Sequence, residues 1–299
     1  MSHSQPLVVT LIANPAQPVL DTTVADKAAS AIHASAVYWL ADTIACDIPV
    51  PDGTSATALY KTLRATLGSR PIDIVVQSVK SRRKKLLVAD MDSTMIEQEC
   101  IDELAEAMGL RGQVADITRR AMNGEIAFEP ALRERVALLK GLSLPVIDRI
   151  IENHITLMPG GRALVQTMKA NGAYTALVSG GFTLFTANIA AKLGFDEHHA
   201  NTLSHDGEKL NGLVQEPILG KRAKLDTLLA LCFKLGLTPD QAIAVGDGAN
   251  DLAMLQTAGS GVALHARPIV AEAANIRIDH GDLSALLYLQ GYRKTDFVS

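Results

Sequence analysis

The chain has 299 residues, and its composition argues against two broad classes of protein. Hydrophobic residues make up 48% of it, which is enough to bury a sizeable core and argues against disorder throughout. The net charge of −4 lacks the basic surplus with which a general nucleic-acid binder neutralises phosphates, so no nucleic-acid partner is expected. At about 150 residues per domain, this length predicts about two domains.

Cysteine usage and hydropathy point to one compartment. Cys46, Cys100 and Cys232 lie far apart and form no CxxC pair, which fits a reducing environment. The first apolar stretch, Leu7–Ala13, is too short to span a membrane, and no apolar run approaches about 18 residues. We therefore expect a cytoplasmic protein that has no membrane partner.

The first 80 residues alternate between strand-like and helix-like segments. Runs rich in Val and Ile predict strands, and runs rich in Ala, Lys and Leu predict helices. Strands are expected at 7–13, 36–40, 43–50 and 72–79, and helices at 24–33 and 56–67. This βαββαβ order predicts a small ferredoxin-like α+β domain over residues 1–80, similar to ACT-type regulatory domains. It carries no catalytic constellation, so we expect a regulatory role or a role in forming a homodimer.

A dense charge run separates this segment from the rest of the chain. Residues 81–85 read Ser-Arg-Arg-Lys-Lys. Without aromatic neighbours, so short a run is weak evidence for a nucleic-acid or membrane patch, and it predicts a solvated linker. The second domain is expected over residues 84–299.

Beyond the linker, strands alternate with helices, which is typical of a doubly wound α/β core with helices on both faces of a parallel sheet. Short apolar runs at 86–89, 174–178 and 242–245 suit central strands buried on both sides, and 261–264 predicts a fourth.

Between the first two of these strands, residues 99–157 contain no strand-like run. Helices are expected at 101–108, 113–122, 130–139 and 145–154, and Leu132, Val136 and Leu139 recur at helical spacing. This segment predicts a helical cap inserted into the core. Farther along, Asp206-Gly207 between apolar residues predicts a β-hairpin.

The first chemical motif is the string DMDST at residues 90–94, directly after a predicted strand. Asp90 and Asp92 are two carboxylates so close that they need compensation, commonly by a divalent cation with oxygen ligands. An Asp at a strand end can also attack phosphorus and form an aspartyl-phosphate. The alternative, a simple helix cap, explains a lone Asp better than it explains the pair.

The second motif, GDGAND at residues 246–251, follows another predicted strand. It does not match the dinucleotide fingerprint G-x-G-x-x-G. Its side chains Asp247, Asn250 and Asp251 suit Mg²⁺ better, although a Gly-rich turn with a capping Asp remains the alternative.

Two further signals concern anions. Ser179 and Gly180 lie between a predicted strand and the expected start of a helix, where a hydroxyl and free N–H groups bind anions. An ordinary tight turn would look the same. Lys224 can bind phosphate as a point charge, but most lysines are simply solvated.

In this order, the DMDST, VSGGF and GDGAND strings and Lys224 resemble the haloacid dehalogenase superfamily and, within it, the phosphoserine phosphatase family. The resemblance covers about residues 84–289. In the cap it includes Glu99, the Ala-Met-Asn-Gly string at 121–124, Phe128 and the Leu-Arg-Glu-Arg-Val string at 132–136. It implies a Rossmann-like, HAD-like core with a helical cap.

The resemblance implies Mg²⁺-dependent hydrolysis of O-phospho-L-serine to L-serine and phosphate, the last step of serine biosynthesis. Asp90 would be the nucleophile, and Asp92 would be the general acid and base. The metal ligands would be the Asp90 carboxylate, the Asp92 backbone carbonyl and Asp247.

The resemblance also implies a set of substrate-binding residues, namely Glu99, Met122, Phe128, Arg135, Ser179, Gly180, Lys224 and Asn250. Ser179, Gly180, Lys224 and Asn250 would hold the phosphoryl group, with Asp251 in a supporting position. In the cap, Glu99 would face the ammonium group and Arg135 the carboxylate. Met122 and Phe128 would close the pocket.

Two alternatives stay open. The same aspartyl-phosphate could pass its phosphoryl group to another alcohol, such as homoserine. In a different class, the chain could be a non-catalytic amino-acid sensor that binds its ligand in the first 80 residues. The presence of Asp90, Asp92, Lys224 and Asp247 argues against the sensor.

Overall fold

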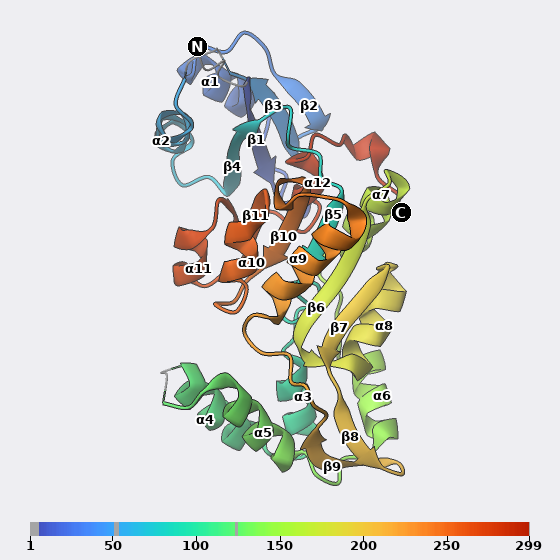
Figure 1. The fold of residues 1–299 in the computed structure, drawn as a ribbon. Helices are drawn as coiled ribbons and strands as arrows, with labels where there is room; N and C mark the ends of the chain where they lie inside the picture. Colours follow the sequence, from blue (N-terminus) through green and yellow to red (C-terminus); the bar gives the residue numbers. More distant parts are fainter. Residues whose placement is uncertain (1–5, 51–53, 123–124, 299) are drawn as a thin grey trace.

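The computed structural model describes residues 6–50, 54–122 and 125–298. In Figure 1 the chain forms an elongated molecule with a small sheet at one end, a larger sheet in the middle and a group of helices at the other end. No helix in the described part of the chain is long and apolar enough to cross a membrane.

The N-terminal segment forms a four-stranded antiparallel sheet in the order β2-β3-β1-β4. Its strands are β1 (Leu7–Ala13), β2 (Tyr38–Ala41), β3 (Ala45–Pro49) and β4 (Ile72–Ser78), and its helices are α1 (Thr22–Ala31) and α2 (Ala56–Leu67). Alternate apolar side chains of β1, including Val9 and Leu11, pack in one core with those of α1 and α2. The elements follow one another in the predicted order.

The larger sheet has six parallel strands in the order β12-β11-β10-β5-β6-β7. They are β5 (Leu86–Ala89), β6 (Tyr174–Phe182), β7 (Glu197–Asn201), β10 (Ala242–Gly246), β11 (Ser260–Leu264) and β12 (Ile276–Ile278). The predicted parallel α/β core is confirmed. The two outer strands escaped prediction because β7 is polar and β12 has only 3 residues.

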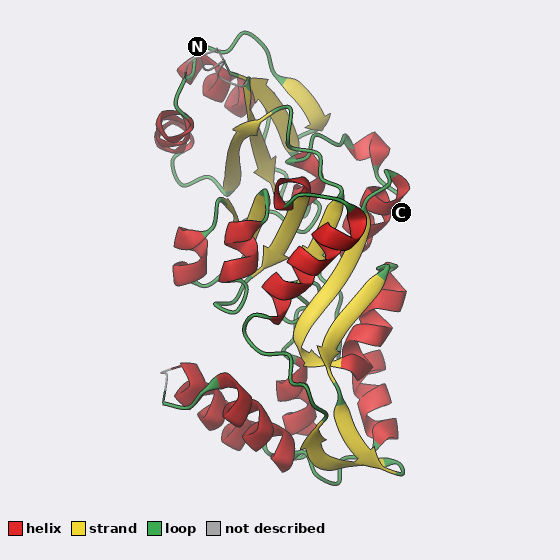
Figure 2. Ribbon diagram, in the orientation of Figure 1, coloured by secondary structure: helices red, strands yellow, loops and turns green. Residues whose placement is uncertain are grey.

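Helices cover both faces of this sheet (Figure 2). One face packs against α7 (Gly161–Ala170), α8 (Thr183–Leu193) and α12 (Ala285–Tyr288), and the other against α9 (Ala223–Leu235), α10 (Leu252–Thr257) and α11 (Pro268–Ala273). Successive residues of β5 alternate between the two cores, as pleated strands require. Single 3₁₀ turns are η1 (Pro239–Gln241) and η2 (Lys294–Asp296).

Between β5 and α7 the described chain forms four helices, α3 (Cys100–Ala107), α4 (Arg111–Met122), α5 (Phe128–Leu138) and α6 (Leu144–Asn153). The hairpin of β8 (Leu203–Asp206) and β9 (Lys209–Val214), which comes later in the chain, packs beside these helices. Leu210 N donates to Leu142 O at 2.9 Å, and Gly141 N donates to Leu210 O at 2.8 Å. We call these helices and the hairpin the cap.

The chain returns from the cap to the sheet at Gly160, where a side chain would not fit. A Cβ there would lie 2.4 Å from the backbone nitrogen of Ser284, and the residue has a φ of +80°. Glycine is therefore the residue that allows α7 to begin against the C-terminal segment.

The charge run at 81–85 matches the predicted solvated linker only in part, because residues 81, 83 and 85 are exposed to solvent and residues 82 and 84 are not. Arg82 forms an ion pair with Asp47 of β3 at 2.7 Å, and Lys84 is buried and donates to Asp240 O at 2.7 Å. The guanidinium of Arg83 lies 4.0 Å from the centre of the Tyr292 ring. The prediction failed for Arg82 and Lys84 because their partners are distant in sequence.

Candidate active site

The motifs converge at the carboxyl ends of three neighbouring strands. β5 lies between β10 and β6 and pairs with both, so the residues that follow these strands meet at one edge of the sheet. Ligands of doubly wound sheets bind outside this edge. Asp90 follows β5, Ser179 lies near the end of β6, and Asp247 follows β10.

Asp90 is held in place through one of its two carboxylate oxygens. Its Oδ1 lies 2.6 Å from Lys224 Nζ and accepts a hydrogen bond from Met91 N at 2.7 Å. Its Oδ2 has no hydrogen bond or ion pair to any other described residue. One oxygen therefore fixes the side chain while the other stays available.

Burial and charge act together on this group. Burial raises the pKa of Asp90 well above its ordinary value, as do the nearby Asp251 and Asp92, while Lys224 opposes the rise. Lys224 is itself buried, and its ammonium group also lies 2.6 Å from Asp251 Oδ1. Burial lowers the pKa of Lys224, but the two carboxylates outweigh this effect and raise it.

Asp92 has both oxygens engaged. Ser179 Oγ donates to its Oδ2 at 2.8 Å, and Cys100 N donates to its Oδ1 at 2.8 Å. Ser179 Oγ in turn accepts from Gly181 N at 2.8 Å. The DMDST and VSGGF motifs are therefore connected directly, although they belong to different strands.

The environment of Ser179 differs from the expected helix N-terminus. β6 runs on through Phe182, and α8 begins only at Thr183. Between the pairs Val178↔His199 and Phe182↔Asn201, β6 has two more residues than β7, and the register shifts there. This bulge, rather than a helix terminus, positions Ser179 and Gly180, as bulges often do beside active sites.

Three carboxylates form a cluster that could hold a metal ion. One oxygen from each of Asp90, Asp247 and Asp251 lies within 4.8 Å of the others. Burial raises the pKa of Asp247, as does Asp251, while a hydrogen bond from Thr94 Oγ1 at 3.0 Å opposes the rise. A divalent cation with oxygen ligands would relieve this crowding, so the donor set fits such an ion.

The glycines of the GDGAND motif make room for these carboxylates. A Cβ at Gly246 would lie 2.3 Å from Asp251 Cγ, and a Cβ at Gly248 would lie 2.4 Å from Asn250 Oδ1. Gly248 N also donates to Asp251 Oδ2 at 2.9 Å. The spacing of the motif therefore has a steric cause.

Glu99 lies beside the catalytic edge at the start of the cap. Its Oε1 accepts from Ser93 Oγ at 2.8 Å. Desolvation of the carboxyl group by nearby protein atoms, together with the charge of Asp92, raises the pKa of Glu99 to about 7. The residue as a whole is nevertheless exposed to solvent.

Arg135 on α5 is half-buried. Its Nε donates to Ala131 O at 3.2 Å, and its Nη1 donates to Thr118 Oγ1 at 3.4 Å. Desolvation lowers the pKa of Arg135, while Asp102 and Glu99 oppose this effect. Glu99 and Arg135 therefore interact electrostatically, and the described structure contains no direct hydrogen bond between them.

Phe128 connects the cap to the sheet edge. A small cavity of about 10 Å³ is lined by Phe128, Ser179, Gly180, Lys224 and Asn250, among others. This volume is about that of one water molecule, so the space that these residues enclose is small. Met122 ends α4, but its side chain lies outside the described part of the structure, as do residues 123–124.

A sequence model for the family of haloacid dehalogenase-like hydrolases matches residues 87–256, which include Asp90, Ser179 and Asp247. The chain belongs to this family. A phosphoserine phosphatase from Polaromonas sp. is 44% identical to it over 73% of this chain and 94% of that protein.

Two solved structures extend the comparison. A HAD family hydrolase from Salmonella enterica matches 95% of this chain and 98% of its own, with a TM-score of 0.85 at 28% identity. A phosphoserine phosphatase structure described as a phospho-aspartyl intermediate analogue matches 69% of this chain and 98% of its own. Its TM-score is 0.64 at 39% identity.

Some parts of this haloacid dehalogenase-like site were not found from the sequence. Thr94 holds Asp247, the backbone of Cys100 holds Asp92, and Leu219 lines the small cavity. Of these, only Thr94 carried a signal, because it lies within the DMDST string. The other two contribute through the backbone or through loop packing, which leaves little trace in the residue type.

Proposed function

We propose that this chain hydrolyses O-phospho-L-serine to L-serine and phosphate through an aspartyl-phosphate. The observation that carries the proposal is the geometry of Asp90. Its Oδ1 is fixed by Lys224 and Met91 N, whereas Oδ2 has no partner among the described residues. A carboxylate oriented in this way at the edge of the sheet suits in-line attack on phosphorus.

In this mechanism Asp92 acts as the general acid and then as the general base. It would protonate the serine oxygen as the ester bond breaks, and then accept a proton from the water that hydrolyses the aspartyl-phosphate. The hydrogen bonds from Ser179 and from the backbone of Cys100 support this role, because they fix the orientation of both Asp92 oxygens. Asp90 must be ionised to attack, and its contact with Lys224 favours the ionised form.

We assign the metal ligands to Asp90, the backbone carbonyl of Asp92 and Asp247, and the metal to Mg²⁺. The clustering of Asp90 and Asp247 oxygens and the crowding of their charges support this assignment. When bound, the ion would neutralise charge between the nucleophile and the phosphate.

The phosphoryl oxygens would be bound by Ser179, the Gly180 N–H, Lys224 and Asn250. The support is that these residues line one small cavity beside Asp90. Asp251 would act as a positioning residue, because its Oδ1 lies 2.6 Å from the ammonium group of Lys224, which also contacts Asp90.

The cap would select the serine part of the substrate. We propose that Glu99 binds the ammonium group and that Arg135 binds the carboxylate, with Phe128 and Met122 closing the pocket. Support comes from the half-buried guanidinium of Arg135 and from the ring of Phe128, which lies against Gly180.

A phosphate-release assay with and without Mg²⁺, over a panel of phosphorylated metabolites, tests this function. We expect release from phosphoserine only with the metal. Adding homoserine or another alcohol separates hydrolysis from transfer, because transfer would yield a phosphorylated acceptor at the expense of free phosphate. A complete lack of metal-dependent release would favour the amino-acid sensor instead.

We also propose a two-domain organisation with a ferredoxin-like, ACT-like domain over 1–80 and a phosphatase core over 84–299, with the cap at 99–157. The antiparallel sheet order of the N-terminal segment supports the first part. A cytoplasmic location is supported by the buried and free state of Cys46, Cys100 and Cys232.

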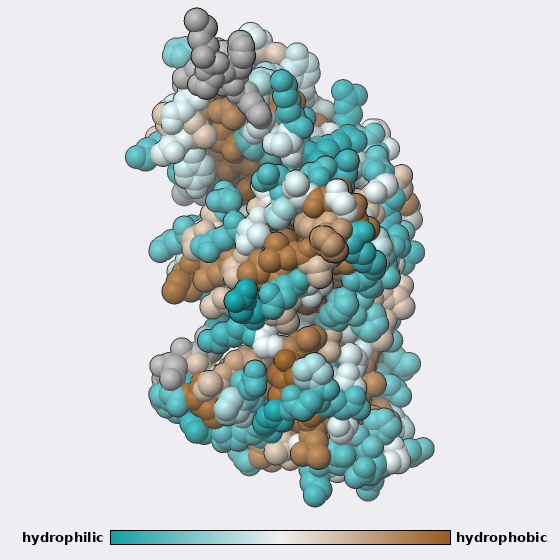
Figure 3. Space-filling model, viewed as in Figure 1, coloured by the Kyte–Doolittle hydropathy of each residue, from teal (hydrophilic) through white to brown (hydrophobic). Residues whose placement is uncertain are grey.

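A homodimer without a nucleic-acid partner completes the proposal. The homodimer is supported by the exposed apolar side chains of α9, on which Leu229 and Phe233 are 41% and 91% exposed. Figure 3 shows hydrophobic surface over this helix. Light scattering of the wild type and of a Phe233→Glu variant tests it, since the variant should shift toward the monomer.

A further inference from the structure

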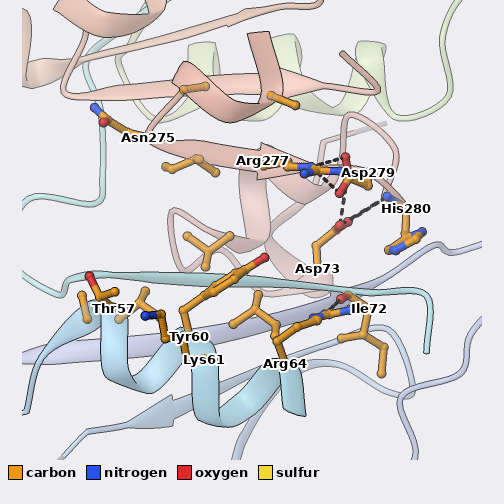
Figure 4. Close-up of a pocket in the computed structure, with 17 residues that line it drawn as sticks. Thr57, Tyr60, Lys61, Arg64, Ile72, Asp73, Asn275, Arg277, Asp279 and His280 are labelled. Carbon is orange, nitrogen blue, oxygen red and sulfur yellow. Dashed lines mark hydrogen bonds and ion pairs between the residues drawn. The ribbon is translucent and has the colours of Figure 1, made fainter. Parts of the chain in front are cut away.

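A cavity of about 670 Å³ lies far from the catalytic edge, between the N-terminal segment and the larger sheet. Figure 4 shows its two walls, with α2 and β4 on one side and the segment around β12 on the other. This volume is within the range of small-molecule sites, which often form where two structural units meet. None of its lining residues belongs to the proposed catalytic machinery.

The lining of this cavity is mixed. Aliphatic side chains come from both walls, with Ile74 and Val76 on β4 and Ile276 on β12. A ligand that fills it therefore needs an apolar portion as well as a polar one.

Polar groups lie on the same walls. Thr57, Tyr60, Lys61 and Asn275 line the open side of the cavity, where all four are exposed to solvent. None of their side chains makes a hydrogen bond or ion pair to another described residue. Water satisfies these groups in the free protein, and a ligand in the cavity can replace that water while it contacts the aliphatic surface beside them.

Most of the charged side chains around the cavity already have partners within the protein, although the buried Nε of Arg64 makes no hydrogen bond. Arg64 donates through its terminal nitrogens to Gly68 O and Ile72 O, and Arg277 forms an ion pair with Asp279 at 2.6 Å. Asp73 accepts backbone hydrogen bonds, including one from Gly281 N at 2.7 Å.

Lys61 is the charged lining group that lacks a hydrogen bond or ion pair among the described residues. It is a single ammonium group rather than an arginine fork or a cluster of cations. It therefore suits one carboxylate better than a phosphate, which carries more charge and needs more donors.

We propose that this cavity is a second ligand site, which binds a small organic carboxylate with an apolar body. The carboxylate lies against Lys61, and the apolar body lies between the aliphatic side chains of β4 and β12. Thr57, Tyr60 and Asn275 supply further hydrogen bonds at the rim.

Calorimetric titration of the full chain with 3-phenylpropionate tests this site, with the uncharged 3-phenylpropanamide as the matched ligand. We expect saturable binding of the acid and about 10-fold weaker binding of the amide, because a charge-assisted hydrogen bond is lost. Lys61→Glu should weaken binding of the acid by at least about 10-fold. Lys27→Glu, an equal charge change at an exposed position of α1, should alter it by less than about 2-fold.

Two more variants separate this site from the others. Arg135→Ala should leave binding of 3-phenylpropionate intact, which excludes capture of the carboxylate at the catalytic edge. Ala274→Trp should abolish binding by filling the cavity without a change of charge. The proposal is overturned if the wild type does not bind the acid, or if the amide binds equally well. It is also overturned if Arg135→Ala abolishes binding, or if Lys61→Glu and Lys27→Glu have the same effect.

Discussion

Two buried aspartates, Asp90 after β5 and Asp73 on β4, have pKa values raised by burial, yet their surroundings differ. Asp73 accepts backbone hydrogen bonds from Asp279 N at 2.9 Å, from His280 N at 3.2 Å and from Gly281 N at 2.7 Å. Asp90 is held by Lys224 through one oxygen, and its other oxygen is left without a partner among the described residues. Asp73, whose carboxylate accepts several hydrogen bonds, holds two segments of the chain together. Asp90, which has one oxygen without a partner, is available for chemistry.

The comparison shows that burial and a raised pKa do not by themselves identify a catalytic group. Carboxylates with a purely structural role can also have shifted pKa values. The kind of partner distinguishes the two cases. Backbone N–H groups fix the position of Asp73, while like charges from Asp251 and Asp92 crowd Asp90. Such crowding is costly for folding and is expected where a cation and a substrate are to bind.

The largest expected effect is the loss of activity in Asp90→Asn. Because the amide cannot attack phosphorus, phosphate release from phosphoserine should fall by at least about 10⁴-fold. The melting temperature should stay the same or rise, because one of several crowded carboxylates is removed. Activity and thermal unfolding should be measured on the same sample. Retained turnover would contradict the role of Asp90 as nucleophile.

Asp73→Ala should give the opposite pattern. Backbone N–H groups of residues 279–281 lose their acceptor, and each buried, unsatisfied donor costs about 1–3 kcal/mol. Since water from the adjacent cavity can replace some of the lost hydrogen bonds, we expect the free energy of unfolding in urea to fall by roughly 3 kcal/mol. The folded fraction should keep its kcat. A loss of stability below about 1 kcal/mol would show that the hydrogen bonds between Asp73 and residues 279–281 contribute little.

Arg135→Ala should change substrate preference more than catalysis. Loss of a charge-assisted contact to the substrate carboxylate should lower kcat/KM for phosphoserine by about 10- to 100-fold. For p-nitrophenyl phosphate, which has no carboxylate, the change should be less than about 3-fold. Arg135→Lys should rescue only part of the loss, because lysine lacks the planar fork. Equal losses on both substrates would argue against the proposed contact.

The sequence indicated which residues meet at this edge of the sheet, because Asp90 and Asp247 directly follow strands of strong apolar character and Asp92 lies two residues after Asp90. Parallel strands bring such residues to one edge whatever the loops do. The sequence did not predict the role of Asp73 or the burial of Lys84, because their partners belong to the distant C-terminal part of the chain. The bulge that presents Ser179 was also missed, since pairing between β6 and β7 decides it.

The smallest expected effect concerns Glu99 in the metal-free protein. Its folded-state pKa is raised from 4.5 to about 7, so the folded state binds a proton more tightly than the unfolded chain does. Its contribution to stability is therefore present below about pH 4.5 and is lost as the pH rises through about 7. Because the residue is exposed, solvent screening should limit the effect to roughly 1 kcal/mol or less.

Glu99→Gln should remove this component, so the stability difference between variant and wild type should grow in favour of the variant between pH 5 and 8. Chemical denaturation at several pH values measures this difference. Bound divalent metal should reduce it, because positive charge near Asp92 offsets the repulsion that raises the pKa of Glu99. A pH-independent difference would mean that solvent screens Glu99 completely, and that the acidic crowding is confined to the buried carboxylates around Asp90.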